Sequence, residues 1–372
     1  MGVFIKNEVS VVGAGTAGLI AAKELSLRGV EVSVYDQKKV LGTPVRASGI
    51  LSIEGLRSLD INYSRAVTNT LYGAEIHGGG RTLRIVSKKA VAHVLDRKAL
   101  NDLCHDEAVS AGATVELGKR LSGEELGRLA EGGVLIGADG AVSSVARHFS
   151  MGEIKRYAIT YKAEFEAAAY DERIVHLFFD NEEARGLFGW ICPNSSELLE
   201  VGIGIDSRNG NCKAAFERFM RRPEVLGAIK GSKRVSGEAS MIPMALRRRL
   251  VDPEHEVLLV GDAAGQVKPS TGGGIVFGGN AAKIAAEVVK SKLEGRSELI
   301  DYERRYRRRY RIDTWIHSAI NIAYSSMNNT QLGLAISASH AFGIDAFLGR
   351  YGDMDMPTRV IRNLLKDMRI SV

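Results

Sequence analysis

Three glycines at the spacing G-x-G-x-x-G mark the segment Gly13–Gly18. The apolar run 9–12 precedes it, and apolar and small residues recur at helical spacing through 16–27. In such a strand–turn–helix unit the first glycine permits the turn, the second lets the backbone approach a pyrophosphate, and the third lets helix and strand pack closely. An acidic residue, Asp36, ends the next strand about 20 residues later, where a carboxylate takes ribose hydroxyls. The pattern predicts a dinucleotide held by Gly13, Gly15, Thr16, Ala17, Gly18 and Asp36.

A second glycine run, Gly272–Gly274, opens a helix that we expect over 274–289. Three glycines at a helix start leave bare backbone N–H groups beside the positive end of the helix dipole. That arrangement stabilises negative charge on a bound group, whereas an ordinary flexible loop is the alternative interpretation. The residues that we expect to contact the cofactor here are Gly272, Gly273, Gly274 and Ile275.

The elements that position these residues alternate in type along the chain. Short apolar strands are expected at 9–12, 30–34, 134–136 and 257–260, and helices at 16–27 and 97–112. Segments 157–165, 174–179 and 199–205 instead alternate apolar and polar residues, which is typical of an antiparallel sheet. We therefore predict an α/β protein with a dinucleotide-binding domain over 1–150 and 251–295, an antiparallel substrate domain over 151–250, and a helical region over 296–372.

Composition narrows the class of protein. The three cysteines are widely spaced and form no C-x-x-C pair, so they predict neither disulfides nor a metal site, and a reducing compartment is expected. The net charge of +6 is concentrated in arginines 247–249 and 304–311. A solvated helix face, an anionic lipid surface and an acidic protein partner remain open, but no nucleic-acid recognition motif accompanies these charges.

Residues 314–344 carry no Asp, Glu, Lys or Arg, which raises the question of a membrane span. Asparagine, glutamine and serine make the stretch too polar for a bilayer core, so we expect two helices packed on the body or lining an apolar channel. The expected localisation is cytoplasmic, with peripheral contact to the inner face of the membrane as a further possibility.

Three segments resemble FAD-dependent hydroxylases and reductases. Gly137–Gly140 resembles their D-G segment, and Gly261–Ala264 resembles the G-D segment whose carboxylate takes the ribitol hydroxyls. The resemblance implies FAD as the cofactor, and it places Arg97, Asp139, Gly261 and Asp262 among the residues that bind it.

The chain further resembles the geranylgeranyl reductase family. The matching residues are Gly261–Gly265 with Pro269 and Thr271–Ile275, the loop Gly42–Arg46, and the segments Gly189–Pro193 and Val201–Gly204. The resemblance implies that Arg46 and Ala47 lie against the flavin, and that Gly273 and Gly274 stabilise charge on its reduced form. These four residues are the catalytic candidates, and Phe188, Trp190 and Ile191 are candidates for the substrate pocket.

Two departures from the family pattern bear on the chemistry. Ala47 stands where the family has a cysteine, and Cys192 and Glu200 stand where phenylalanine and asparagine are usual. The implied reaction is saturation of C=C bonds in prenylated ether lipids, with electrons from NAD(P)H or a ferredoxin-like protein. A flavin-dependent monooxygenase or other flavin dehydrogenase is the main alternative, and a prenyl-lipid carrier that keeps FAD structurally is a third.

Overall fold

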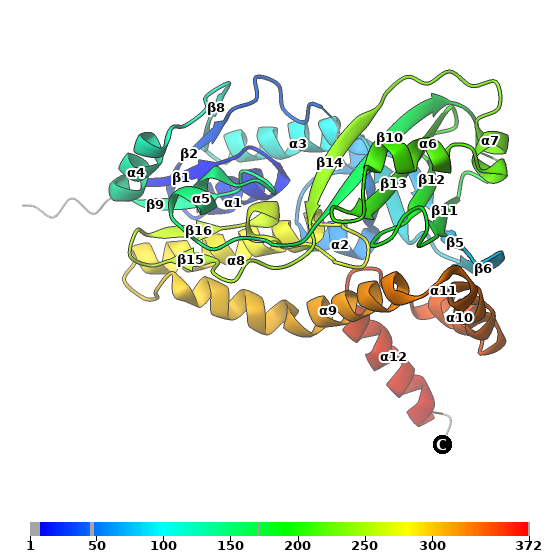
Figure 1. The fold of residues 1–372 in the computed structure, drawn as a ribbon. Helices are drawn as coiled ribbons and strands as arrows, with labels where there is room; N and C mark the ends of the chain where they lie inside the picture. Colours follow the sequence, from blue (N-terminus) through cyan, green and yellow to red (C-terminus); the bar gives the residue numbers. More distant parts are fainter. Residues whose placement is uncertain (1–7, 45–47, 170, 371–372) are drawn as a thin grey trace, which may run out of the picture.

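The structure, a computed structural model, describes residues 8–44, 48–169 and 171–370. Two large sheets lie beside each other, and helices of the C-terminal third run beneath both of them (Figure 1). A small third sheet consists of β3 (Ile50–Ser52), β7 (Ala92–Leu95) and β4 (Val67–Leu71), in that spatial order.

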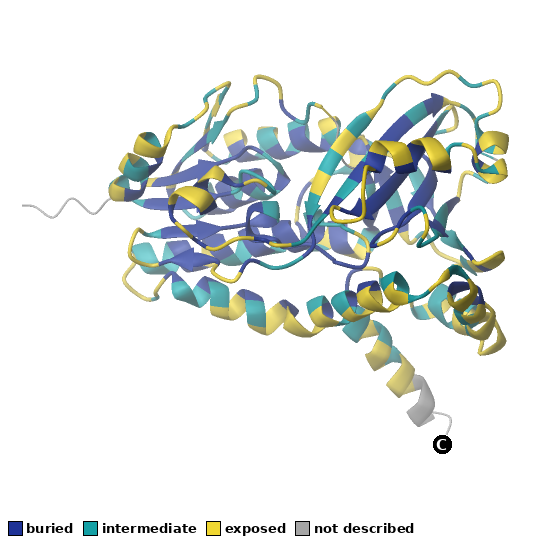
Figure 2. Ribbon diagram, viewed as in Figure 1, coloured by how far each residue is buried: buried dark blue, intermediate teal, exposed yellow. Residues whose placement is uncertain are grey.

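The first large sheet has six strands and carries the glycine turn. Its spatial order is β15 (Val251–Asp252), β16 (Val257–Leu259), β9 (Val134–Gly137), β1 (Glu8–Val12), β2 (Glu31–Asp36) and β8 (Thr114–Leu117). All neighbours run parallel except β15 and β16. The apolar runs of β1, β9 and β16 are buried on both faces, as parallel strands covered by helices require, whereas burial alternates along β2 (Figure 2).

The second large sheet has seven strands. Its order is β14 (Glu238–Pro243), β10 (Tyr157–Glu166), β13 (Leu198–Asp206), β12 (Gly189–Pro193), β11 (Ile174–Phe179), β5 (Gly73–Gly78) and β6 (Arg81–Val86). The sheet is antiparallel except for the parallel pair β11–β5. Strands β5 and β6 come from within 1–150, so this sheet extends beyond the predicted segment 151–250. The domain division itself stays a prediction.

Helices cover the sheets and supply the rest of the core. Beside the six-stranded sheet, α1 (Thr16–Ser26) packs on both α3 (Arg97–Ser110) and α8 (Ile275–Leu293). The shorter helices are α2 (Ile53–Ser58), α4 (Gly123–Gly132), α5 (Ser144–His148), α6 (Cys212–Phe219) and α7 (Pro223–Ala228), with 3-10 turns at Ser64–Ala66 and Gly261–Ala264. The predicted fold class, an FAD-binding α/β fold of the hydroxylase type with an inserted antiparallel sheet and C-terminal helices, is confirmed.

The C-terminal region is helical, as predicted. It contains α9 (Ile300–Ser326), α10 (Asn329–Ala341), α11 (Ile344–Tyr351) and α12 (Pro357–Ile370), and α12 projects away from the body (Figure 1). The tyrosines interleaved with the arginines, Tyr302, Tyr306 and Tyr310, are buried in the core. Within the described residues no single helix has the length and apolarity to cross a bilayer, and α10 with α11 meets that test only as a pair bent by 72°.

Candidate active site

The turn Gly13–Gly18 joins β1 to α1. Gly13 has a φ of +109°, and a Cβ there would lie 2.3 Å from the Ala138 carbonyl oxygen. A Cβ on Gly18 would lie 2.0 Å from the carbonyl oxygen of Gly13, so helix and strand approach as closely as the motif requires. Gly15 differs from both, because a Cβ built there meets nothing within 4 Å. The space over Gly15 lies at the N-terminus of α1 and fits a pyrophosphate.

Two of the helices at this site begin at a glycine without a side-chain cap. They are α1, which starts after Gly15, and α8, which starts after Gly274. In contrast, α3 and α4 are capped by the side chains of Asp96 and Ser122. The first backbone N–H groups of an uncapped helix are satisfied by water or by a ligand, and the helix dipole adds positive character. Both termini therefore suit negatively charged parts of a cofactor.

The carboxylate of Asp36 holds the glycine turn in shape. It accepts hydrogen bonds from the backbone N–H groups of Ala14 at 2.7 Å and Lys38 at 2.8 Å. The Thr16 hydroxyl donates to the Asn101 amide oxygen at 2.8 Å, which ties α1 to α3. Both side chains stand at the predicted site, and direct contact of either with FAD stays a prediction.

Asp139 is engaged within its own loop. Its carboxylate accepts hydrogen bonds from the Ser143 hydroxyl at 2.6 Å and from the hydroxyl and backbone N–H of Ser144 at 2.7 and 2.6 Å. These contacts fix the start of α5. The predicted contact of Asp139 with the cofactor therefore competes with a full set of local partners.

Close packing brings the two glycine segments together. A Cβ on Gly261 would lie 3.0 Å from the Ala17 side chain, and one on Gly278 would lie 2.8 Å from the Gly261 Cα. The start of α8 therefore packs directly on the turn after β16 and on α1. Residues predicted from opposite ends of the chain thus surround one site.

Arg97 and Asp262 form an unusual pair of charges on the wall of this site. The Nε and Nη1 atoms of Arg97 are buried and have no hydrogen-bond partner among the described residues. Burial lowers the pKa of Arg97 to about 10 and raises the pKa of the Asp262 carboxyl to about 6. Buried guanidinium donors without partners cost free energy unless a bound molecule accepts their hydrogen bonds, and the Asp262 carboxylate is disfavoured by desolvation. Hydroxyl and phosphate groups of FAD fit this requirement.

The raised pKa of Asp262 makes a testable prediction about the apoprotein. A group whose pKa is raised on folding favours the fold below its ordinary pKa of 3.8, and this contribution is lost as pH rises through about 6. One pKa unit corresponds to about 1.4 kcal/mol. Because Asp262 lines the cavity, access of solvent reduces the free energy expected from its pKa shift. Asp262→Asn should therefore stabilise the apoprotein by on the order of 1–3 kcal/mol at pH 7.5 and by nothing measurable at pH 4.

Urea unfolding of FAD-free wild type and variant at the two pH values measures this difference. Asp139→Asn is the matched control. The Asp139 carboxylate is hydrogen-bonded in its loop, so this variant should be less stable than wild type. Equal stability of wild type and Asp262→Asn at pH 7.5 would show that ionised Asp262 carries no burial penalty.

The loop before α8 folds back on itself around Lys268. The Lys268 carbonyl accepts from the N–H of Gly272 at 2.7 Å, and the Lys268 N–H donates to the Gly273 carbonyl at 3.0 Å. A Cβ on Gly274 would lie 2.8 Å from the Asp262 carboxylate, so a larger residue would displace that group. The predicted contacts Gly272, Gly273, Gly274 and Ile275 all line one cavity with Asp262 and Arg97.

That cavity has a volume of about 280 Å³ and lies between this loop and the seven-stranded sheet. Its sheet side is mainly apolar and includes Val175, Leu177, Leu187 and Ile242, with the hydroxyls of Thr160 and Ser240 among them. Its polar lining comes from the loop side and from three hydroxyl groups, those of Ser48, Thr160 and Ser240. An apolar wall facing a cofactor loop suits a hydrocarbon substrate.

Two of the three predicted pocket residues face this cavity. Phe188 and Trp190 line it, whereas Ile191 lines a second cavity on the opposite face of the sheet. Successive side chains of a strand point to opposite faces, so adjacent positions 190 and 191 cannot share one pocket wall. Gly202 makes room for Trp190, since a Cβ there would lie 2.2 Å from the indole ring.

A buried charge network lies behind the Trp190 indole. The Glu200 carboxylate, with a relative exposure of 0%, pairs with the Lys162 ammonium at 2.6 Å and accepts the Trp190 indole N–H at 2.8 Å. The Ser48 hydroxyl, on the cavity wall, also donates to Glu200. Burial, with a contribution from Glu200, raises the pKa of the Cys192 thiol well above its ordinary value. Glu200, which stands where the family has asparagine, is therefore connected to the cavity by its hydrogen bond with Ser48.

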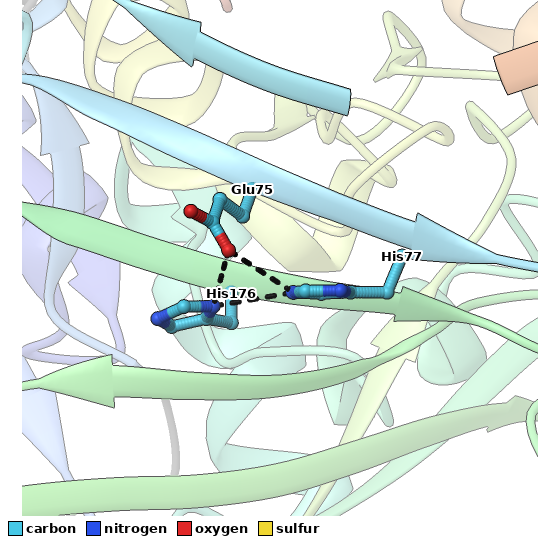
Figure 3. A group of neighbouring side chains, drawn as sticks. All are labelled: Glu75, His77 and His176. Carbon is cyan, nitrogen blue, oxygen red and sulfur yellow. Dashed lines mark hydrogen bonds and ion pairs between the residues drawn. The ribbon is translucent and has the colours of Figure 1, made fainter. Parts of the chain in front are cut away.

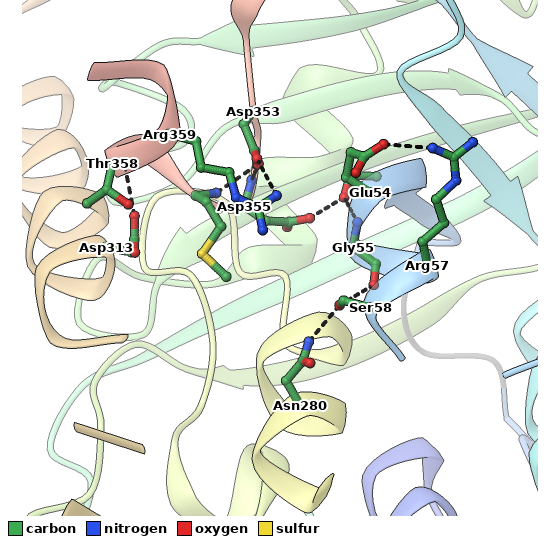
Figure 4. A network of polar contacts seen from close by, with 12 residues as sticks. Glu54, Gly55, Arg57, Ser58, Asn280, Asp313, Asp353, Asp355, Thr358 and Arg359 are labelled. Atoms are coloured by element: carbon green, nitrogen blue, oxygen red, sulfur yellow. Dashed lines mark hydrogen bonds and ion pairs between the residues drawn. The ribbon is translucent and has the colours of Figure 1, made fainter. Parts of the chain in front are cut away.

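The segment before α12 closes the far end of the loop (Figure 4). The Asp355 carboxylate takes the Lys268 ammonium at 2.6 Å and the Ser52 hydroxyl. Asp353 accepts the N–H groups of Asp355 and Met356, and Asp313 accepts that of Thr358 at 2.9 Å. Sequence reasoning assigned no role to this segment. The remaining catalytic candidates, Arg46 and Ala47, lie outside the described residues.

Comparison with known proteins now bears on this site. Residues 8–324 match the family described as Lycopene cyclase protein. Digeranylgeranylglycerophospholipid reductase 2 of Methanothermobacter thermautotrophicus is 30% identical over 337 residues, which is 82% of this chain and 84% of that protein. The chain belongs to the geranylgeranyl reductase family. As expected from its glycine and aspartate segments, it is an FAD-dependent oxidoreductase.

Solved structures agree on the fold. A geranylgeranyl bacteriochlorophyll reductase-like protein of Thermoplasma acidophilum superposes with a TM-score of 0.80 at 20% identity, covering 95% of this chain and 94% of that one. A flavin-dependent brominase superposes with a TM-score of 0.69 at 17% identity, covering 98% and 99%. At these identities the likeness concerns the fold, which reductases share with oxygen-using flavoenzymes.

Proposed function

We propose that this member of the family saturates isolated C=C bonds in the geranylgeranyl chains of isoprenoid ether lipids. The observation that carries the proposal is the cavity, in which an apolar sheet wall faces the glycine loop of α8 and the Arg97–Asp262 pair. The names of the reductase relatives support the same substrate class. An isolated alkene has no carbonyl to polarise, so positioning in a dry pocket must supply much of the rate enhancement.

When bound and reduced, FAD would supply a hydride to one alkene carbon. The other carbon requires a proton, and the sequence has alanine where the family has a cysteine. We infer that Ser48 Oγ hands on this proton from the Glu200–Lys162 pair, because it contacts Glu200 and lines the cavity. In this route the Lys162 ammonium gives a proton to Glu200 as Glu200 passes one to Ser48 Oγ, and solvent returns a proton to Lys162 after turnover.

The decisive experiment uses dithionite-reduced holoenzyme and a geranylgeranyl ether lipid without oxygen. A mass gain of two per double bond, together with reoxidation of the flavin, is the expected result. Product that forms only when oxygen is admitted would identify a monooxygenase instead. Failure of the reduced protein to be reoxidised by the alkene or by a quinone would indicate a lipid carrier.

Ser48→Ala tests the proton route. We expect alkene-dependent flavin reoxidation to slow by roughly 100-fold, within the range of lost general acid catalysis, while dithionite reduction of the flavin is unchanged. Thr160→Val is the matched control, since it removes another hydroxyl from the same cavity wall. Equal rate losses in the two variants would contradict a proton role for Ser48. So would a wild-type rate of flavin reoxidation that is unchanged in D₂O.

Access to lipid and electrons requires an outer surface, and the C-terminal helices offer apolar residues for it. Trp315 is 69% exposed, Leu334 is 66% exposed and Phe342 is 82% exposed. We propose that these residues contact the membrane that holds the substrate. We further propose that NAD(P)H or a ferredoxin-like protein docks transiently to reduce the flavin. Flotation with anionic and neutral vesicles measures the membrane contact, and Phe342→Ser should weaken it.

A further inference from the structure

Glu75, His77 and His176 gather on two adjacent strands, and none of them lines the FAD-side cavity (Figure 3). Strands β5 and β11 run parallel, and Glu75 is the register partner of His176. His77 lies two residues after Glu75, so alternation along the strand places both side chains on the same face. The backbone thus brings together two histidines that are 99 residues apart in the chain.

One atom from each side chain points toward a common centre. The Nε2 of His77 lies 3.2 Å from the Nδ1 of His176, and the Glu75 Oε2 lies 3.4 Å from that Nδ1 and 3.7 Å from the Nε2. Zinc binds imidazole nitrogen and carboxylate oxygen at about 2.0–2.2 Å, usually with tetrahedral geometry, so two of its ligand atoms stand roughly 3.3–3.5 Å apart. The three observed separations surround this value.

The remaining polar atoms of His77 and Glu75 have partners that orient these side chains. The Nδ1 of His77 is hydrogen-bonded to the Thr82 hydroxyl at 3.0 Å. The second oxygen of Glu75, Oε1, pairs with the Arg84 guanidinium at 2.6 Å. Such outer contacts fix the tautomer and ring orientation of a metal-binding histidine. Burial lowers the pKa of both His77 and His176, which favours the neutral imidazole that a metal ion binds.

A cavity leaves room for a fourth ligand. His77 and His176 line a space of about 300 Å³ together with Ile174, Phe178 and Ile191. It lies on the face of the seven-stranded sheet opposite the FAD-side cavity, since Val175 and Leu177 of the same strand line the latter. The side chains of the three residues are 17–30% exposed, so an ion can enter.

We propose that Glu75, His77 and His176 form a binding site for a divalent transition-metal ion of the zinc class, with an exchangeable fourth position toward this cavity. Two imidazoles and one carboxylate are a ligand set that zinc uses where one coordination position stays open. The ion would join β5 to β11, the one parallel pair of the seven-stranded sheet. The proposal does not depend on the substrate of the FAD site.

The test uses FAD-loaded protein that is stripped of metal with a chelator and then loaded with Zn²⁺. Elemental mass spectrometry counts the zinc ions bound per chain, and competition with a chromophoric chelator measures the affinity. We expect one zinc per chain, and at least roughly 100-fold weaker binding in His77→Ala and in His176→Ala. Thr82→Val should weaken binding by roughly 10-fold, as loss of an outer hydrogen bond does. Co²⁺ should show the visible bands of a four-coordinate site.

His255→Ala is the matched control, because Asp252, Glu254 and His255 form the other histidine–carboxylate group among the described residues and are more exposed at Glu254 and His255. It should keep full zinc affinity, and every variant should keep the flavin spectrum of a folded protein. If wild type with intact flavin retains no zinc, or if His77→Ala and His255→Ala bind it equally, the three residues form only a hydrogen-bonded group and the proposal fails.

Discussion

Replacing Gly15 with leucine is expected to abolish FAD binding while leaving the fold intact. The Cβ position of Gly15 meets nothing within 4 Å, and the backbone there has an ordinary extended conformation with φ −78°. Leucine is a poorer helix cap than glycine, which costs up to about 1 kcal/mol. Its side chain would fill the space over the first N–H groups of α1, where the pyrophosphate is expected. Two lost charge-assisted hydrogen bonds at about 1.5–3 kcal/mol each correspond to at least roughly 100-fold weaker binding.

Gly18→Leu provides the contrast within the same motif. Its Cβ would lie 2.0 Å from the carbonyl oxygen of Gly13, so the apoprotein itself should be destabilised. Flavin fluorescence titration measures affinity, and thermal unfolding without FAD measures the fold. We expect Gly15→Leu to lose affinity with a near-normal apoprotein melting temperature, and Gly18→Leu to lose both. Normal FAD affinity in Gly15→Leu would exclude the pyrophosphate from this helix terminus.

The sequence could predict which segments carry the candidate cofactor residues, because the pattern of each segment is local in sequence, whereas their contacts with FAD stay a prediction. A strand, a glycine turn and a helix start within ten residues define the site at Gly13–Gly18, and a buried strand followed by Gly261 and Asp262 defines its other half. Each segment needs only its own backbone to present N–H groups or a carboxylate. The structure adds that Asp262 and Arg97, 165 positions apart, line one cavity.

The substrate side was less predictable, for two physical reasons. Every residue of β12 is buried, so hydrophobicity shows no alternation there and does not indicate that Trp190 and Ile191 face opposite cavities. The polar contacts behind the pocket also join distant segments. Ser48 and Glu200 are 152 residues apart, and Ser52 and Asp355 are 303 residues apart. Of these four residues, only Glu200 departs visibly from the family pattern in the sequence. That departure does not indicate that Ser48 is its hydrogen-bond partner.

The buried pair Lys162–Glu200 should have a large effect on stability. Lys162→Met leaves the fully buried Glu200 carboxylate without its cation, and breaking a buried pair from one side costs about 3–5 kcal/mol. The surface pair Lys98–Asp102 has the same 2.6 Å separation but side chains that are 45% and 43% exposed. Lys98→Met should therefore cost at most about 1 kcal/mol. Urea unfolding of the FAD-loaded proteins measures both free energies.

The double variant Lys162→Met/Glu200→Gln separates stability from chemistry at this pair. Removing both charges also removes the cost of an unpaired ion, so the double variant should recover most of the stability lost in Lys162→Met. It should nevertheless stay as slow as Ser48→Ala in alkene-dependent flavin reoxidation, because no transferable proton remains behind Ser48. A stable double variant with wild-type turnover would reduce the pair to a structural role. Unchanged stability in Lys162→Met would contradict a stabilising role for the pair.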